Sequence, residues 1–238
     1  MGGAALFFDL APTSATLSDV NDELVNCYQT VRDAPKQLID ALRTHYYDKD
    51  YYYHMRNLDR DRDAFAALSC VERAARLLFL NRTGFNGMYR VNSKGQFNVP
   101  FGRYSNPNIV NEEGILAASE ALQHVTIQHS PFELMAAQAV PGDFIYFDPP
   151  YVPLSDTSYF TSYAQDDFGY ADQVRLAETC RQLAEKNISF IASNSYCDAV
   201  KELYQPFEFA EIKARRSINA SGNGRQPVSE ILIWHKAQ

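Results

Sequence analysis

The hydrophobic pattern of the chain alternates between short apolar runs and longer stretches in which apolar residues recur at helical spacing. The runs that predict strands are residues 15–20, 125–128, 144–147 and 188–192, followed by a terminal hairpin over 207–218 and 228–234. Between residues 34 and 80 the spacing is helical throughout and predicts helices at about 35–44, 50–58 and 63–80. Strands alternating with helices predict an α/β fold, and the helical stretch predicts an insertion into it.

Composition and charge narrow the class of protein. With 238 residues, 46% of them apolar, the chain suits one large domain or a core domain with an insertion. Cys27, Cys70, Cys180 and Cys197 lie too far apart to indicate a zinc site or a disulfide framework, so no metal is expected. No long apolar run or targeting segment is present, which predicts a cytoplasmic protein with no membrane partner. A net charge of −7 argues against indiscriminate coating of nucleic acid but leaves room for a local basic face.

One tetrapeptide stands out, Asp148-Pro149-Pro150-Tyr151, directly after the apolar run 144–147. A buried strand that ends in a carboxylate, two prolines and an aromatic ring places hydrogen-bond acceptors beside a flat stacking surface. In open α/β sheets, ligands bind at the carboxyl edge of the strands. The alternative interpretation is a sharp turn with no chemical role.

A second acidic residue, Asp19, ends the first strand-like run. A carboxylate at a strand tip can accept two hydrogen bonds from a ribose diol, which favours a nucleotide-like ligand. Taken alone, however, Asp19 is better explained as the cap of the helix that follows.

Residues 81–104 change character. Four glycines, four asparagines and four basic residues are interleaved with aromatics, which predicts a hairpin-like surface element. Amides and guanidinium groups read base edges, and an exposed aromatic can wedge between base steps. An ordinary hairpin insertion explains the composition equally well. The basic residues around the terminal hairpin, Arg215 and Arg216 among them, suit either phosphate contacts or solvated charge.

Taken together, the alternating strands and helices, the Asp-Pro-Pro-Tyr motif, the block from Asn81-Arg82 to Gly102-Arg103-Tyr104, and the run 214–218 resemble the Dam-type (D12 class, class alpha) DNA adenine-N6 methyltransferases. The resemblance extends from Gly2 to about His235. It implies a class I, Rossmann-like sheet that binds S-adenosylmethionine (SAM). It further implies a catalytic domain formed by residues 1–33 and 124–238, and a target-recognition insertion formed by 34–123 with its hairpin at 81–104.

The resemblance implies transfer of a methyl group from SAM to a flipped adenine in double-stranded DNA. GATC is the expected site, although a related palindrome stays open. A restriction-modification role, an orphan role and a phage-borne role are all compatible. The implied catalytic residues are Asp148, Pro149, Pro150 and Tyr151. The implied cofactor-binding residues are Gly2, Gly3, Asp19, Asn21, Ser130, Pro131, Phe132 and Asp148. The implied DNA-binding residues are Phe85 as the wedge, with Asn86, Met88, Arg90, Asn92, Pro100, Arg103, Arg215 and Arg216.

The sequence departs from the family pattern in one respect. In the family, a strand ending in Phe-x-Gly-x-Gly opens the SAM site, whereas here Gly2 matches the first of these glycines and Ala4 replaces the second. The first central strand therefore appears absent, which would leave two neighbouring strands without hydrogen-bond partners. Three explanations are open: another polypeptide supplies the strand, the sequence is a truncated product, or the fold adjusts. The alternative function is accordingly a DNA-binding pseudoenzyme of the same fold with weak or no activity.

Overall fold

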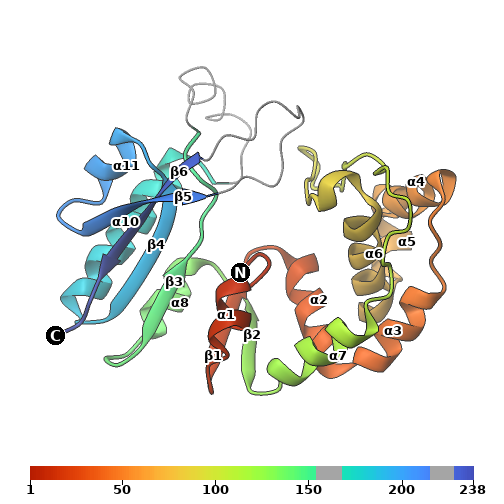
Figure 1. Cartoon of the computed structure of the whole chain (residues 1–238), viewed down its shortest axis with the longest axis horizontal. Coiled ribbons are helices and arrows are strands. Elements are labelled where there is room, and N and C mark those ends of the chain that lie inside the picture. Colours follow the sequence, from red (N-terminus) through yellow and green to blue (C-terminus); the bar gives the residue numbers. More distant parts are fainter. Residues whose placement is uncertain (154–167, 215–227) are drawn as a thin grey trace. The chain divides into compact units, whose positions relative to one another are not determined.

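The computed structural model describes residues 1–153, 168–214 and 228–238 (Figure 1). The chain divides into two compact units, a first unit from Met1 to Ser130 and a second unit from Pro131 to Gln238. In the parts of the chain that are described, no helix has the length and apolar character needed to cross a bilayer.

The first unit contains a two-stranded parallel sheet with helices on the connections. Strand β1 (Ala15–Asp19) pairs with β2 (Val125–His129), so that Ala15 lies opposite Val125 and Asp19 opposite His129. The helices near this sheet are α1 (Ala5–Leu10), α2 (Asp22–Asp33) and α7 (Glu112–Ala121). Because the strands are parallel and in register, Asp19 at the end of β1 lies beside the segment that follows β2.

Residues 35–87 of the first unit are mostly helical, as the spacing predicts up to residue 80. Its elements are α3 (Pro35–Arg43), α4 (Lys49–Asn57), η1 (Leu58–Arg60), α5 (Arg62–Ala66), α6 (Cys70–Thr83) and η2 (Phe85–Gly87). The single helix expected over 63–80 is wrong, since two helices form there. Ser69 starts a new helix by accepting from the Glu72 amide, and Glu72 caps the Ser69 amide in return.

The segment after α6 folds back on itself. Two isolated antiparallel bridges, Gly84 with Phe101 and Val91 with Phe97, hold it together without regular strands. Phe97 and Val99 are buried against α4 and α6 in a separate apolar cluster with Tyr52, Phe79 and Leu80. The hairpin-like element expected over 81–104 is therefore present, and one of its sides is anchored on helices.

The second unit is a four-stranded mixed sheet in the order β3-β4-β6-β5. Its strands are β3 (Phe144–Phe147), β4 (Ser189–Ser195), β5 (Glu208–Ala214) and β6 (Val228–His235), and only β3 and β4 are parallel. Its helices are α8 (Phe132–Gln138), α10 (Tyr170–Glu185) and α11 (Asp198–Leu203). Leu176, Cys180 and Leu183 of α10 are buried in one core with Phe190 and Ile233 of the sheet.

The mixed α/β architecture confirms the expected fold class. Within the described ranges, no strand precedes β1. Strands β1 and β3 each end a sheet, with a second edge that pairs with no other described strand.

Candidate functional site

The Asp-Pro-Pro-Tyr segment begins where β3 ends. Phe147, the last residue of β3, lies opposite Ala192 of β4 in parallel register. The next residues on the two strands therefore meet, and Ser193 donates its hydroxyl proton to Oδ1 of Asp148 at 2.9 Å. Ser193 is buried while Asp148 is exposed. The carboxylate is thus oriented from behind by a rigid strand and presents its remaining acceptor sites outward.

A buried polar network fixes the chain that follows Asp148. Gln173 of α10 donates to the Pro150 carbonyl at 2.7 Å. Asn194 accepts from the Val152 amide at 3.0 Å and donates to Gln173 at 3.0 Å, while Ser195 donates to the Val152 carbonyl at 2.6 Å. Each buried polar group has its partner, so the network makes the conformation of the segment specific.

The half-buried ring of Tyr151 lies beside this network, with its hydroxyl 3.4 Å from Oε2 of Glu230. Burial raises the pKa of Tyr151 to about 12, assisted by the nearby charges of Asp148 and Glu230, although a hydrogen bond with Ser193 partly opposes the rise. Tyr151 is therefore neutral at physiological pH. None of the described residues donates to the Pro149 carbonyl, so both Asp148 and Pro149 have acceptor capacity at this strand end.

In the first unit, three of the other expected cofactor residues come together around Asp19. Its Oδ1 accepts from the Asn21 amide at 3.0 Å, and its Oδ2 accepts from the Met1 ammonium at 2.7 Å and from the Gly2 amide at 3.4 Å. The Ser130 amide donates to the Asp19 carbonyl at 3.1 Å. Burial raises the pKa of Asp19, but these hydrogen bonds and the ammonium charge outweigh it and hold the pKa below its ordinary value. The carboxylate stays ionised and accepts from several donors at once.

Asn21, and not Asp19, caps the following helix, because Asn21 Oδ1 accepts from the Leu24 amide at 3.2 Å. The interpretation of Asp19 as a helix cap is therefore wrong. Of the remaining expected cofactor residues, Gly3 is exposed next to Gly2. Pro131 and Phe132 belong to the second unit, where Pro131 precedes α8 and the Phe132 ring packs edge-on at 6.4 Å from Phe147.

The expected wedge residue, Phe85, stands on a tight turn. Its amide donates to the Pro100 carbonyl at 2.9 Å, and its side chain is 38% exposed. Asn86 and Gly87 both have left-handed backbones, with φ of 54° and 62°, and Asn81 donates to the Gly87 carbonyl at 2.5 Å. Glycine adopts this conformation freely, whereas a non-glycine residue such as Asn86 holds it where surrounding contacts enforce it. The turn therefore presents an aromatic ring to solvent from a rigid base.

Other expected DNA-binding residues lie in the hairpin and differ in how their side chains are held and exposed. Arg90 is held by Asn98, which accepts from Nε at 2.6 Å and from Nη2 at 3.1 Å. Asn92 acts inside the turn, where its Oδ1 accepts from the amides of Lys94 and Gln96. Met88 is half-buried, and Arg103 is exposed.

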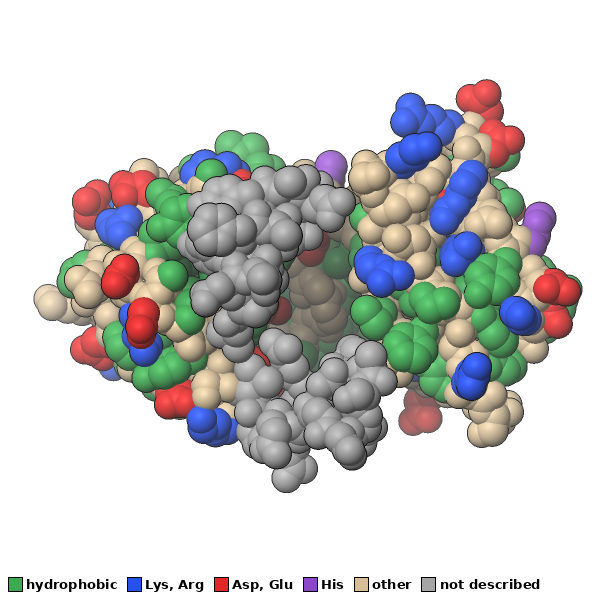
Figure 2. Space-filling model, turned by 90° about the horizontal axis from the view of Figure 1, so that it is seen from above, with side chains coloured by type: hydrophobic (Ala, Val, Ile, Leu, Met, Phe, Trp, Pro, Cys, Tyr) green, Lys and Arg blue, Asp and Glu red, His purple; other side chains and the backbone are tan. Residues whose placement is uncertain are grey.

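Basic side chains spread over this end of the first unit. Figure 2 shows Lys and Arg predominating over Asp and Glu on that face, with hydrophobic side chains between them. A face of this kind suits a polyanion even in a chain whose overall charge is negative. The other two expected basic contacts, Arg215 and Arg216, lie outside the described residues.

Sequence reasoning missed the residues that hold the site in place. Ser193, Asn194 and Gln173 are polar residues of a strand and a helix, and nothing in their spacing distinguishes them from surface positions. The available signal was the polar run at 193–195, which directly follows an apolar strand and is buried in the structure.

These features define an α/β methyltransferase. The strand-end Asp-Pro-Pro-Tyr presents oriented acceptors beside an aromatic ring, and a strand-tip carboxylate and a basic hairpin lie in the other unit. The model of the D12 class N6 adenine-specific DNA methyltransferase family matches residues 1–218, and the chain belongs to this family. It is therefore an adenine-specific DNA methyltransferase that takes its methyl group from a donor molecule.

Curated relatives match almost the whole chain. The Type II methyltransferase M1.LlaDCHI of Lactococcus lactis subsp. cremoris is 47% identical over 237 residues, which cover 98% of this chain and 83% of the relative. The Type II methyltransferase M.MjaIII of Methanocaldococcus jannaschii is 38% identical, over 98% of this chain and 85% of the relative. The DNA adenine methylase of Escherichia coli K12 is 32% identical, over 99% of this chain and 84% of the relative.

Proposed function

We propose that this methyltransferase uses SAM as its donor and methylates N6 of an adenine flipped out of double-stranded DNA, within GATC. The observation that carries the proposal is the orientation of the Asp148 carboxylate by Ser193 at the carboxyl end of β3, with Tyr151 beside it. On this proposal residues 1–33 and 124–238 form the catalytic domain, and residues 34–123 form the target-recognition insertion.

The acceptor side of the reaction follows from the chemistry of adenine. N6 is a poor nucleophile because its lone pair is delocalised into the ring. Asp148 and the Pro149 carbonyl accept the two N6 hydrogens and draw the nitrogen toward tetrahedral geometry, and neither proline has an amide proton that would compete. The neutral ring of Tyr151 stacks on the base. These groups act through proximity and fixed electrostatics, and a general base is unnecessary because the proton can leave after transfer.

The donor side fits the Asp19 cluster. SAM supplies an electrophilic methyl group on a sulfonium sulfur. Asp19 stays ionised and already accepts from an ammonium and two amides, so its chemistry suits the ribose hydroxyls of the cofactor. A diol there would take over the Oδ2 position that Met1 and Gly2 now share. Gly2, Gly3, Asn21 and Ser130 would line the same end of the sheet. Pro131, Phe132 and Asp148, which belong to the second unit, are the further cofactor-binding residues that the family resemblance implies.

The DNA side rests on the hairpin. N6 is shielded inside a duplex, so the base has to leave the stack at a cost of a few kcal/mol. Insertion of the exposed Phe85 ring would offset part of this cost. Arg90 carries the bidentate donor geometry that reads guanine, and Asn86, Met88, Asn92 and Pro100 would contact the rest of the site, while the exposed Arg103 would contact a phosphate. Arg215 and Arg216 would bind phosphates.

Two measurements test the proposal. Isothermal titration of the folded protein with SAM should show saturable binding, and a folded sample that binds DNA but no SAM would favour the pseudoenzyme alternative. Plasmid from a methylation-free host that expresses the protein should resist enzymes blocked by methylated GATC. Resistance at another palindrome, with GATC still cleaved, would show that the assigned sequence is wrong while the chemistry stands.

A further inference from the structure

The strand of the hairpin that contains Phe97 has one backbone edge that is not used in pairing with the other strand. Phe97 lies opposite Val91, and the hairpin hydrogen bonds flank this pair, from the Asn92 amide to the Gln96 carbonyl and from the Asn98 amide to the Arg90 carbonyl. In an antiparallel ladder, a residue between such bonds points its own N–H and C=O away from the partner strand. The backbone of Phe97 therefore faces the helices, with one donor and one acceptor to satisfy.

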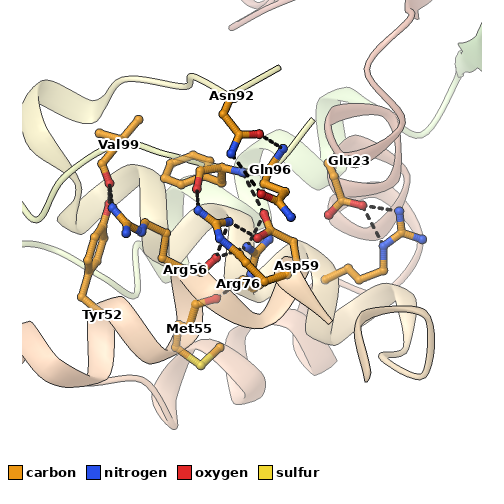
Figure 3. Close-up of polar contacts among 12 residues, drawn as sticks. Glu23, Tyr52, Met55, Arg56, Asp59, Arg76, Asn92, Gln96 and Val99 are labelled. Atoms are coloured by element: carbon orange, nitrogen blue, oxygen red, sulfur yellow. Dashed lines mark hydrogen bonds and ion pairs between the residues drawn. The ribbon is translucent and has the colours of Figure 1, made fainter. Parts of the chain in front are cut away.

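Two adjacent side chains of η1 take up both groups (Figure 3). Oδ2 of Asp59 accepts from the Phe97 amide at 2.8 Å, and Nη2 of Arg60 donates to the Phe97 carbonyl at 2.6 Å. Asp59 and Arg60 also pair with each other. Together they replace the backbone of a third strand at this one residue.

The same edge is bound again two residues later. The Val99 carbonyl accepts from the Tyr52 hydroxyl at 3.0 Å and from Arg56 at 3.4 Å. Successive bonds at positions i and i+2 allow a single register, because a slip of one residue would turn the other face of the chain toward the helices. Phe97 and Val99, both buried, would then exchange places with polar neighbours.

Asp59 is itself held by the helical framework. Arg76 of α6, 3% exposed, forms an ion pair with Oδ2 of Asp59 at 2.9 Å and donates to the carbonyls of Met55 and Arg56 at 2.7 and 2.8 Å (Figure 3). A buried guanidinium with all these acceptors cannot shift without leaving groups unpaired. The Asp59 carboxylate therefore fixes the position of the hairpin relative to α4 and α6.

We propose that Asp59 and Arg60 are positioning residues for sequence recognition, which fix the register of the hairpin through the Phe97 backbone and so aim Arg90 and its neighbours at the bases. This inference rests on the proposed role of the hairpin in reading DNA. It assigns specificity to two residues that touch no base. Their loss should therefore affect discrimination between DNA sequences more than overall affinity, which depends on phosphate contacts.

The sharpest test compares Asp59→Asn with Asp59→Ala. Both variants leave Arg76 without its counter-charge, so the resulting loss of stability is common to the pair. Only the asparagine keeps an oxygen that can accept from the Phe97 amide. We expect Asp59→Ala to lower the ratio of kcat/KM for a GATC duplex to that for duplexes with one changed base pair by about tenfold, and Asp59→Asn to restore most of that ratio. Hydrogen exchange at the Phe97 amide should speed up in the alanine variant.

Arg60→Met gives an independent test with a matched control. Arg32 resembles Arg60 in exposure, 24% against 29%, and in chemistry, since it pairs with adjacent Asp33 and donates to the Val125 carbonyl. It lies away from the hairpin, on α2. Arg60→Met should lose discrimination, while Arg32→Met should keep it.

The outcomes distinguish the positioning role of Asp59 and Arg60 from the proposed DNA-reading role of the hairpin. Faster exchange at Phe97 with reduced discrimination in Asp59→Ala and Arg60→Met supports the positioning role. Unchanged discrimination in a folded Asp59→Ala or Arg60→Met protein overturns it while methylation of DNA by the wild type stands. A wild type that shows no preference among the duplexes contradicts the proposed DNA-reading role of the hairpin, and the positioning role with it.

Discussion

At the scale of single residues, the site depends on how one serine meets one carboxylate. The register of β3 and β4 places Ser193 beside Asp148, and the serine hydroxyl, itself buried, sets which way the carboxylate faces. Without this contact, an exposed aspartate would sample several rotamers, and fixing one of them when the base binds would cost conformational entropy. Ser193 thus prepares the acceptor before DNA binds.

Removing this hydroxyl should slow methyl transfer and leave substrate binding alone. We expect Ser193→Ala to reduce kcat by about tenfold, the worth of one hydrogen bond to a charged group, with little change in KM. Ser119→Ala is the matched control, because Ser119 is also buried and donates to a backbone carbonyl, that of Arg32. A drop of equal size in the control would assign the effect to general loss of stability.

At the scale of elements, buried side-chain networks replace regular pairing in both units. Gln173 and Asn194 hold the segment after β3, and Tyr52 helps to hold the hairpin. Because these segments lack strand partners, their conformation depends on a few polar contacts in low-dielectric surroundings, where an unpaired group is costly.

Gln173→Leu tests the first of these networks. The substitution keeps the volume but leaves the Pro150 carbonyl and the Asn194 amide without their partner, at a cost of about 1–3 kcal/mol in the free energy of unfolding. We expect kcat to fall more than that loss of stability explains at a temperature where the variant is fully folded. Normal kcat in a folded variant would show that the segment needs no such support.

Tyr52 makes the second network sensitive to high pH. Burial raises the pKa of Tyr52 to about 12, whereas the unfolded chain ionises near the ordinary value of 10. The contribution of this group to stability is therefore complete below pH 10 and is lost as pH rises toward 12, by up to about 1.4 kcal/mol per pH unit. Tyr52→Phe should flatten the dependence of the free energy of unfolding on pH in that window. Denaturant titrations at pH 8 to 11 would measure the slope, and an unchanged slope would contradict the assignment.

The elements that could be predicted are those whose own residues mark them, such as an apolar run or a proline that ends a strand. The apolar run 144–147 and the prolines after Asp148 define a strand and its end without help from the rest of the fold. Strand β4 extends past the expected 188–192 because polar Ser193, Asn194 and Ser195 pair with β6, a long-range contact that local hydrophobicity does not encode. For the same reason the partners of Phe97, distant in sequence, could not be foreseen.

At the scale of the whole molecule, a chain of net charge −7 has to bind a polyanion. The basic face of the first unit reconciles these facts, because the charges nearest the phosphates decide the local potential at physiological ionic strength (Figure 2). Of the residues named in the proposal, the hairpin and Asp19 belong to the first unit and Asp148 belongs to the second.

The salt dependence of DNA affinity measures how many phosphates this face contacts. The logarithm of the association constant should fall linearly with the logarithm of salt concentration, and Arg103→Ala should reduce the slope by about one unit if Arg103 contacts one phosphate. Affinity for cognate and altered duplexes should weaken alike. A loss confined to the cognate duplex would instead place Arg103 on a base.

The central claim is transfer of a methyl group from SAM to adenine N6 with Asp148 as acceptor. The most direct measurement incubates the folded protein with isotopically labelled SAM and a GATC duplex, then identifies the labelled nucleoside by mass spectrometry. We predict label in N6-methyladenine for the wild type and at least a hundredfold less for Asp148→Asn, with DNA affinity nearly unchanged. Label on another base, or equal transfer by Asp148→Asn, would contradict the account.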